Sequence, residues 1–121
     1  MSEKTLHRAV CDYLRLQYPE VLFNTDLSGS MKLTIGQAKA LKNLRSCRGW
    51  PDLFIAEPRG GFAGFFLELK QEGKIYETRH VKEQKQMIER LKDKGYFAFM
   101  AAGFDEAKKV IDAYMGLPEG N

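Results

Sequence analysis

Three charged residues stand where apolar segments begin or end: Asp52, Glu68 and Lys70. Asp52 opens the apolar segment 53–56 directly after a proline, and the other two close the segment 62–70. Two carboxylates that converge repel each other, and a divalent cation such as Mg²⁺, which prefers oxygen ligands, relieves that repulsion. An ammonium group beside such an ion can orient or help to deprotonate a bound water and stabilise a charged transition state. These residue types therefore favour hydrolysis at a Mg²⁺ or Mn²⁺ centre.

The two strands predicted for these segments would bring the charged groups together. Successive side chains of a strand alternate between its faces, so Glu68 and Lys70 point the same way, about 6.6 Å apart along the strand. The apolar side chains of that strand point the other way and supply core: Phe65, Leu67 and Leu69. A Pro-x-Gly-Gly turn within 57–61 favours a hairpin that places Asp52 beside Glu68, where the backbone carbonyl of Leu69 could be a third ligand. The plainer alternatives are a turn residue at Asp52 and a solvated ion pair between Glu68 and Lys70.

Apolar residues at helical and strand-like spacing predict the elements that hold these groups. Helix ends are marked by caps and breakers: Pro19, Thr34, Gly95 and Asp105. A loop is expected over 26–30. The predicted order is helix 2–18, strand 21–23, a helix from 35, strands 53–56 and 62–70, helix 81–94, strand 96–102 and a last helix ending at 116. This order predicts an α/β or α+β sheet covered by helices, in which residues 62–102 form a parallel crossover unit.

Size and composition agree with one globular domain over 1–121. Hydrophobic residues make up 44% of the 121 residues and charged residues 29%, which is ordinary for such a domain. The longest apolar run, 96–102, is far too short to span a bilayer, and the first residues lack the apolar core of a secretion signal. Cys11 and Cys47 make neither a disulfide framework nor a zinc pattern. We therefore expect a cytoplasmic setting and no membrane partner.

Positive charge is concentrated between residues 27 and 51, a segment without Asp or Glu that contains five basic residues: Lys32, Lys39, Lys42, Arg45 and Arg48. Contacts from such residues to phosphate would be independent of sequence and sensitive to salt. On charge alone, a solvated helix face is an equal alternative. We interpret residues 31–48 as a basic helical insertion. Its apolar side would pack on its own domain or on a second copy of the chain: Ile35, Ala38, Leu41 and Leu44.

Pro51-Asp52 followed by Glu68-x-Lys70 resembles the PD-(D/E)xK nuclease motif on two adjacent strands. More narrowly, the chain resembles the VRR-NUC domain family. The matching features are Gly49-x-Pro51-Asp52-Leu53, Glu68-x-Lys70, and Gln84 on a helix that leads to Gly95 and an apolar strand. The likeness runs from the first helix to about Ala102. It implies an α/β fold like that of restriction endonucleases, with a central mixed sheet flanked by helices in a single domain.

The resemblance also implies a set of site residues. Asp52, Glu68 and the carbonyl of Leu69 would bind Mg²⁺ or Mn²⁺, Lys70 would position the attacking water, and Gln84 would join the active-site network. Members of the fold carry an acidic residue on the first helix that reaches the metal, and the best matches here are Glu3 and, more weakly, Glu20. From the residues alone, His7 and His80 are interpreted as incidental. The alternatives are that His7, which faces the Glu3 side, supports a metal ligand, and that His80 contacts phosphate.

The activity implied by the resemblance is a metal-dependent endodeoxyribonuclease. Standalone domains of the family resemble dimeric enzymes that resolve four-way junctions, so branched DNA and a homodimer are expected. The compact single-domain form suggests a bacterial or phage origin. A nickase or restriction-type nuclease on ordinary duplex is one alternative, and a non-catalytic DNA-binding module on the same fold is another. An inactive relative would typically lack one of Asp52, Glu68 and Lys70, and this chain has all three.

Overall fold

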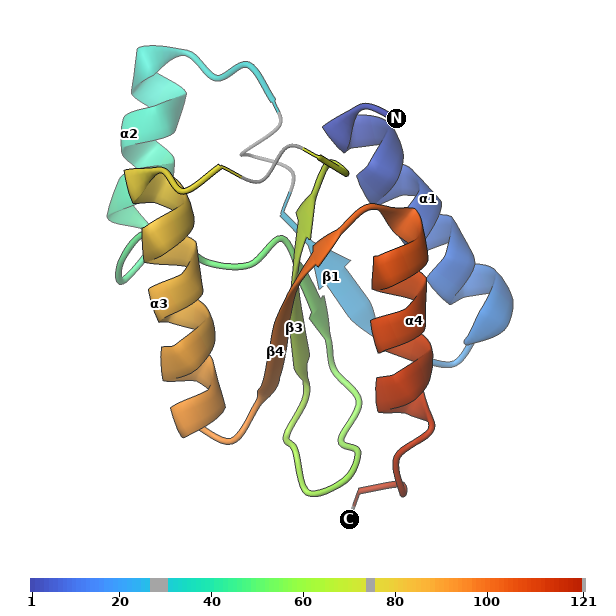
Figure 1. The fold of residues 1–121 in the computed structure, drawn as a ribbon. Helices are drawn as coiled ribbons and strands as arrows, with labels where there is room; N and C mark the ends of the chain where they lie inside the picture. The colour runs from blue at the N-terminus through green and yellow to red at the C-terminus, as the bar shows by residue number, and fades with distance from the viewer. Residues whose placement is uncertain (27–30, 74–75, 121) are drawn as a thin grey trace.

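The computed structural model describes residues 1–26, 31–73 and 76–120. Its strands form one sheet in the order β1-β2-β3-β4, with helices on both faces (Figure 1). Along the chain the elements are α1 (Glu3–Gln17), β1 (Phe23–Thr25), α2 (Ile35–Asn43), β2 (Leu53–Ile55), β3 (Phe65–Lys70), α3 (Arg79–Asp93), β4 (Phe97–Ala102) and α4 (Phe104–Met115). Their order is the one predicted from the sequence. None of the helices described here is both long enough and apolar enough to cross a membrane.

The sheet is mixed. β2 pairs antiparallel with β1 and with β3, whereas β3 pairs parallel with β4. The hairpin between β2 and β3 contains a further antiparallel bridge between Arg59 and Phe62. α3 then carries the chain from β3 to β4, so the parallel crossover predicted for residues 62–102 is confirmed. The α/β class with a central mixed sheet flanked by helices is confirmed as well.

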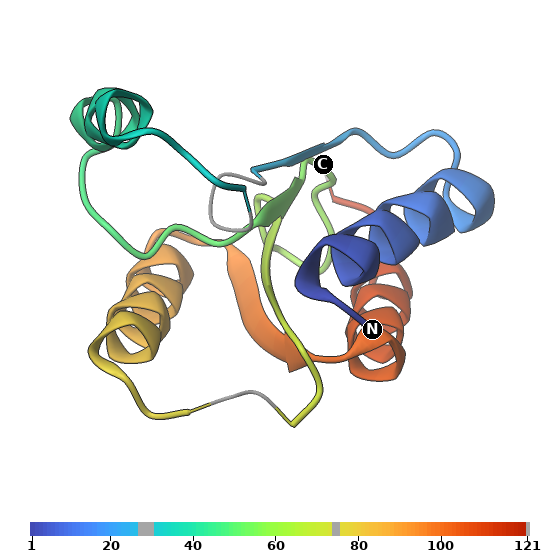
Figure 2. The same cartoon turned by 90° about the horizontal axis from the view of Figure 1, so that it is seen from above.

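The alternation of side chains along the strands builds a hydrophobic core on each face of the sheet. One core joins the sheet to α1 and α4, with buried residues that include Leu6, Val10, Leu53, Phe65, Leu67 and Ile111. The other joins it to α3, through Met87, Ile88, Leu91 and Ala98. Figure 2 shows α1 and α4 together on one side and α3 on the other. β3 contributes side chains to both cores, so the strand that carries the predicted site is held on both faces.

Two tyrosines fasten α1 to α4. The hydroxyl groups of Tyr13 and Tyr18 both donate to Oδ1 of Asp112, over 2.6 and 2.7 Å. Partial burial, together with this hydrogen bond and the nearby carboxylate charge, raises the pKa of Tyr18 to about 12. Both phenols therefore stay neutral donors at physiological pH. These bonds hold the C-terminal part of α1, and the buried side chains of Leu6 and Val10 hold its first turns against the sheet.

The first strand starts later in the chain than the sequence predicts. The first strand was expected over 21–23, but the N–H of Val21 donates to the carbonyl of Tyr18 and closes a turn after α1. β1 therefore begins only at Phe23. The loop expected over 26–30 lies outside the described residues from position 27 onward.

Caps explain the remaining differences. The predicted cap of α2 is confirmed, since Thr34 and Gln37 form a reciprocal capping box. α3 starts two residues earlier than expected because the Thr78 hydroxyl accepts from the N–H of Val81. The prediction that Asp105 caps the last helix is wrong: that helix starts from Gly103, without a side-chain cap, and Asp105 lies in its first turn. β2 and β3 are shorter than predicted because residues 56–64 form the hairpin connection.

Candidate active site

Asp52 lies at the end of β2, next to β3. The strand register pairs Leu53 with Leu67, so Asp52 comes opposite Glu68. Its Oδ2 accepts the backbone N–H of Leu69 over 3.0 Å, which holds the carboxylate against β3. In an antiparallel pair, the N–H and C=O of one residue face the same neighbouring strand. The carbonyl of Leu69 therefore also faces the side on which Asp52 lies, as a third ligand would need.

The loop before Asp52 is fitted closely to α3. Gly49 has φ 90°, and a Cβ built there would lie only 2.7 Å from the carbonyl oxygen of Glu83. A side chain at this position would be strained by the backbone conformation and would collide with the helix backbone. Gly49 thus allows the chain to pass against α3 and enter β2 at Pro51, which is buried. This close approach explains why glycine precedes the Pro-Asp pair.

Glu68 is almost completely buried, at 1% exposure. Its Oε2 accepts from Nε2 of Gln84 over 3.0 Å and lies 3.5 Å from Nζ of Lys70. Burial, and then the neighbouring carboxylate of Asp52, raise the pKa of Glu68 to about 9, while Lys70 acts in the opposite direction. The predicted neighbours Asp52, Glu68, Lys70 and Gln84 are therefore together in the structure.

Several polar atoms at this place have no hydrogen-bond partner among the described residues. They are Oε1 of Glu68, Oε1 of Gln84 and both ring nitrogens of His7. Polar groups this deeply buried are nearly always paired, because an unpaired one loses its hydration without compensation. A carboxylate oxygen, a carboxamide oxygen and an imidazole nitrogen can all accept from a donor or bind a cation. The donor set thus fits a divalent ion.

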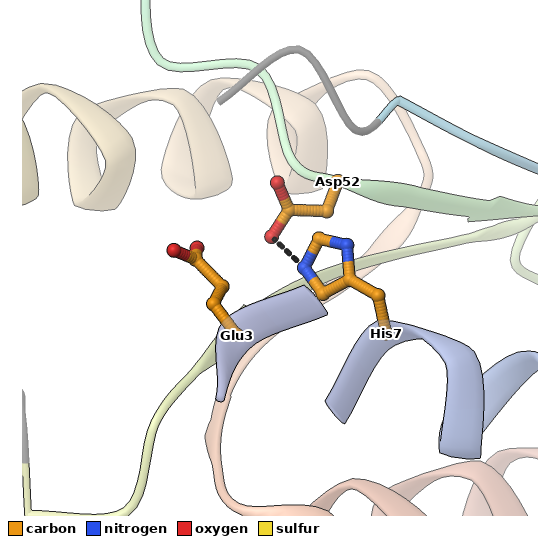
Figure 3. Close-up of side chains that lie close together, drawn as sticks. All are labelled: Glu3, His7 and Asp52. Carbon is orange, nitrogen blue, oxygen red and sulfur yellow. Dashed lines mark ion pairs between the residues drawn. The ribbon is translucent and has the colours of Figure 1, made fainter. Parts of the chain in front are cut away.

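A second group of side chains reaches Asp52 from α1. Glu3 and His7 are one turn apart on the helix, and both project toward the Asp52 carboxylate (Figure 3). Nε2 of His7 lies 3.4 Å from Oδ2 of Asp52, and one ligand atom from each of the three residues lies within 4.8 Å of the others. The helix start that carries Glu3 is fixed by Ser2, whose hydroxyl accepts from the N–H of Thr5.

The two groups meet at Asp52 from opposite faces of the sheet. Glu3 and His7 approach from the α1 side, and Glu68 with Gln84 from the α3 side. Within the described part of the chain, the close cluster consists of Glu3, His7 and Asp52, and Glu68 is not part of it. The three predicted acidic ligands therefore do not all lie as close together as these three residues do.

Of the two histidines and Glu20, only His7 lies next to Asp52 among the described residues. His7, interpreted from the sequence as incidental, is buried beside Asp52 at 3% exposure. Its helical spacing from Glu3 was the only available signal. His80 is exposed, but its Nε2 lies 3.2 Å from Nε2 of Gln84. Glu20 is exposed beyond the end of α1 and does not join the cluster formed by the described residues.

The basic segment lies to the α3 side of the molecule (Figures 1 and 2). Four of its predicted DNA-binding residues are exposed: Lys32, Lys39, Lys42 and Arg48. The fifth, Arg45, is half-buried and forms an ion pair with Asp26. A surface pocket lined in part by Arg45, Trp50 and Asp52 runs from Leu44, at the end of α2, to Asp52. The basic helix is thus connected to the candidate site.

α2 does not pack on its own domain as a core helix. None of its residues is buried. The exposed fractions are 79% for Ile35 and 82% for Leu44, just after the helix, while Leu41 is half-buried. Of the two interpretations of its apolar side, packing on its own domain is therefore wrong for Ile35, Ala38 and Leu44.

Comparisons with known proteins bear on the fold and the family. No protein-family model matches the sequence, and no curated protein matches it. A solved structure described as a VRR_NUC domain protein aligns with 100% of this chain and 93% of its own, with a TM-score of 0.76 and 28% sequence identity. This full-length likeness, with Asp52 beside the Glu68-x-Lys70 residues of the neighbouring strand, supports the resemblance of the chain to the VRR-NUC domain family.

Proposed function

We propose that this chain is a Mg²⁺- or Mn²⁺-dependent endodeoxyribonuclease that hydrolyses phosphodiester bonds. The family fold is a nuclease-like, DNA-processing one. The single observation that carries the proposal is the arrangement of Asp52 and Glu68 as close carboxyl groups with Nζ of Lys70 beside them. A buried acid whose charged form is disfavoured by a second acid is a common feature of catalytic and metal-binding sites.

Oxygen atoms at the end of β2 would hold the ion. They belong to Asp52, Glu68, the carbonyl of Leu69 and, from α1, Glu3. When bound, a divalent ion supplies Lewis-acid polarisation of a phosphoryl oxygen and a more acidic water. Gln84 holds the Glu68 side chain by donating to its Oε2, so the carboxyl group has one defined orientation.

Lys70 would act directly on the reacting groups. Its ammonium is partly buried on the face of β3 that also carries Glu68. From there it can donate to the attacking water and orient it, and then stabilise the negative charge that develops on the phosphoryl oxygens. The water oxygen forms the new bond to phosphorus as the bond from phosphorus to the leaving sugar oxygen breaks. The water's proton is passed to solvent, and the leaving oxygen takes up a proton.

Branched DNA cut by a homodimer is our proposed substrate and assembly. The described residues offer one carboxylate cluster per chain, whereas paired cuts in a four-way junction need two, and a two-fold dimer supplies them. The exposed apolar residues of the basic segment provide a surface for a second copy: Ile35 and Leu44. The basic residues of the segment would contact the DNA backbone rather than base edges.

A cleavage assay with matched substrates tests the function. We expect a four-way junction to be cut in Mg²⁺ or Mn²⁺ and not in EDTA, with paired cuts in opposing strands, while a linear duplex of the same sequence is cut far more slowly. Sedimentation at the assay concentration should show a dimer. Equal cutting of the duplex would replace the junction proposal by an ordinary duplex nuclease, and binding without cleavage under all conditions would indicate a non-catalytic module.

Replacing Lys39 and Lys42 by glutamine is expected to weaken DNA binding and flatten its salt dependence. Removing one lysine–phosphate interaction lowers the slope of log K against log salt concentration by about 0.9, so the slope of the double variant should fall by nearly 2. Both side chains are exposed, and the fold should be retained. Fluorescence anisotropy between about 50 and 200 mM salt measures this.

The matched control removes the same charge at the far end of α3. Lys92 and Lys94 are exposed at the last turn and C-cap of that helix, away from Asp52. Glutamine at both positions should leave the salt slope nearly as in the original chain. An equal fall in slope in the two double variants would mean that net charge, and not α2, determines binding.

A further inference from the structure

We infer that His7 is a direct ligand of the site's metal ion, and that this nitrogen ligand makes the site prefer Mn²⁺ over Mg²⁺. The inference rests on the proposed metal-dependent function and specifies which ion that function uses. The acidic residues Asp52 and Glu68 alone would form an oxygen site typical of Mg²⁺. An imidazole in the same cluster changes its chemistry.

The first support is burial without a partner. His7 is only 3% exposed, and neither of its ring nitrogens has a hydrogen bond within the described part of the chain. Most buried imidazoles spend one nitrogen on a backbone carbonyl or a carboxylate. Here Nε2 has only the 3.4 Å contact with the Asp52 carboxylate, too poorly aligned for a hydrogen bond, and Nδ1 has no hydrogen-bond partner among the described residues, so no structural hydrogen bond accounts for a histidine at this apolar position between Leu6 and Val10.

The second support is the direction of the ring. Nε2 of His7 faces the Asp52 carboxylate at 3.4 Å, as Figure 3 shows, and Glu3 lies on the same side of the helix. Oδ2 of Asp52, the nearer oxygen, already accepts the N–H of Leu69. The three ligand atoms lie within 4.8 Å of one another. That spread is close to the roughly 4 Å between opposite ligands of a small divalent ion, for which metal–ligand distances are about 2.0–2.2 Å.

The chemistry of the donor set selects the ion. Carboxylate, carbonyl and water oxygens suit Mg²⁺ and Mn²⁺ alike, but imidazole is a ligand for transition metals and contributes little to Mg²⁺. A site with one nitrogen and several oxygens therefore favours Mn²⁺ among the two ions proposed. His7 would act as the residue that determines metal specificity, while Asp52 and Glu68 remain the shared anionic ligands.

Pulsed EPR of Mn²⁺ bound to the full chain tests this without any substitution. Imidazole nitrogen coordinated to Mn²⁺ gives a ¹⁴N modulation that oxygen ligands do not give. We expect this modulation in the unaltered protein and its loss in His7→Gln. The His7→Gln change should also weaken Mn²⁺ binding by at least about tenfold, which is in the range found when groups that support a metal ligand are removed. Mg²⁺ binding, measured by competition, should weaken much less.

His80 provides the matched control, because it is the only other histidine of the chain. His80→Gln should retain the ¹⁴N modulation. Bound Mn²⁺ with oxygen ligands alone, together with Mg²⁺-supported cleavage, would overturn the inference and leave the proposed nuclease intact; His7 would then be a counter-ion for Asp52. Absence of any ion binding, with no cleavage, would overturn both. Equal weakening of Mn²⁺ and Mg²⁺ in His7→Gln would also overturn the selectivity assigned to this residue.

Discussion

Replacement of Lys70 by alanine is expected to lower the rate of DNA cleavage at saturating Mg²⁺ by about 10³-fold, because one preorganised group that stabilises transition-state charge is worth about 10²–10³ in kcat. The loss should exceed that of an exposed lysine because Nζ is held 3.5 Å from Glu68 Oε2, beside the proposed metal ligands. Affinity for DNA should change less than about threefold, since one phosphate-attracting charge among many is removed. Single-turnover kinetics and anisotropy without divalent ions separate the two effects.

Two further variants make the Lys70 result specific. Lys94→Ala removes an exposed lysine at the C-cap of α3 and should leave the cleavage rate unchanged. Lys70→Arg retains the positive charge in a larger, planar group, and should remain severely impaired because position as well as charge matters. The loss expected for such a group is about 10²–10³-fold. If Lys70→Ala instead cleaves within about tenfold of the original rate, far short of the loss expected for such a group, Lys70 has no part in the mechanism.

Replacement of Glu68 by glutamine is expected to abolish the stabilisation that Mg²⁺ gives the folded chain. Ligand binding at a concentration 100-fold above Kd stabilises a fold by about 2.7 kcal/mol. For a domain of this size, that corresponds to a rise in Tm of about 8–16 °C. Glutamine matches the shape of a protonated Glu68, whose pKa is raised to about 9 by burial and by Asp52, so the variant should fold normally without metal. Cleavage should fall by at least about 10³-fold, because an anionic ligand is lost.

Calorimetry with and without Mg²⁺ measures this response. Glu89→Gln makes the same chemical change at an exposed position of α3, where the side chain forms an ion pair with Lys92, and should keep the full Mg²⁺ response. A normal Tm without Mg²⁺ is needed to show that Glu68→Gln has folded. If that protein still gains the same stability from Mg²⁺, then Glu68 is not a ligand and the site must be sought around Glu3, His7 and Asp52.

The fold and the β3 half of the site could be predicted because their signals are local. Strand alternation places Glu68 and Lys70 on one face of the strand. It places the apolar residues of the other face in the core, and the structure confirms both placements: Phe65, Leu67 and Leu69 are buried there. The helix stripes likewise identify the faces of α1 and α3 that are buried, including Gln84. These patterns depend only on the geometry of single elements.

What could not be predicted depends on contacts between distant segments. A lone histidine on a helix has no motif, and His7 gains its neighbour only when residue 52 is brought against α1. The start of β1 depends on a turn closed by Tyr18 and on pairing with β2. A helix that packs on its own domain and a helix that packs on another molecule have the same apolar spacing in the sequence. Only the structure, in which Ile35 and Leu44 are exposed, distinguishes the two cases for α2.

The absence of buried residues in α2 has an evolutionary consequence. Substitutions on a helix outside both hydrophobic cores change the folding free energy little, usually within about 0.5 kcal/mol. β3, in contrast, cannot vary freely because it is packed on both faces. On the proposed function, selection can therefore remodel the exposed helix α2 to suit new DNA shapes while the residues of β3 stay as they are. Grafting α2 between relatives would then be a direct route to altered substrate choice.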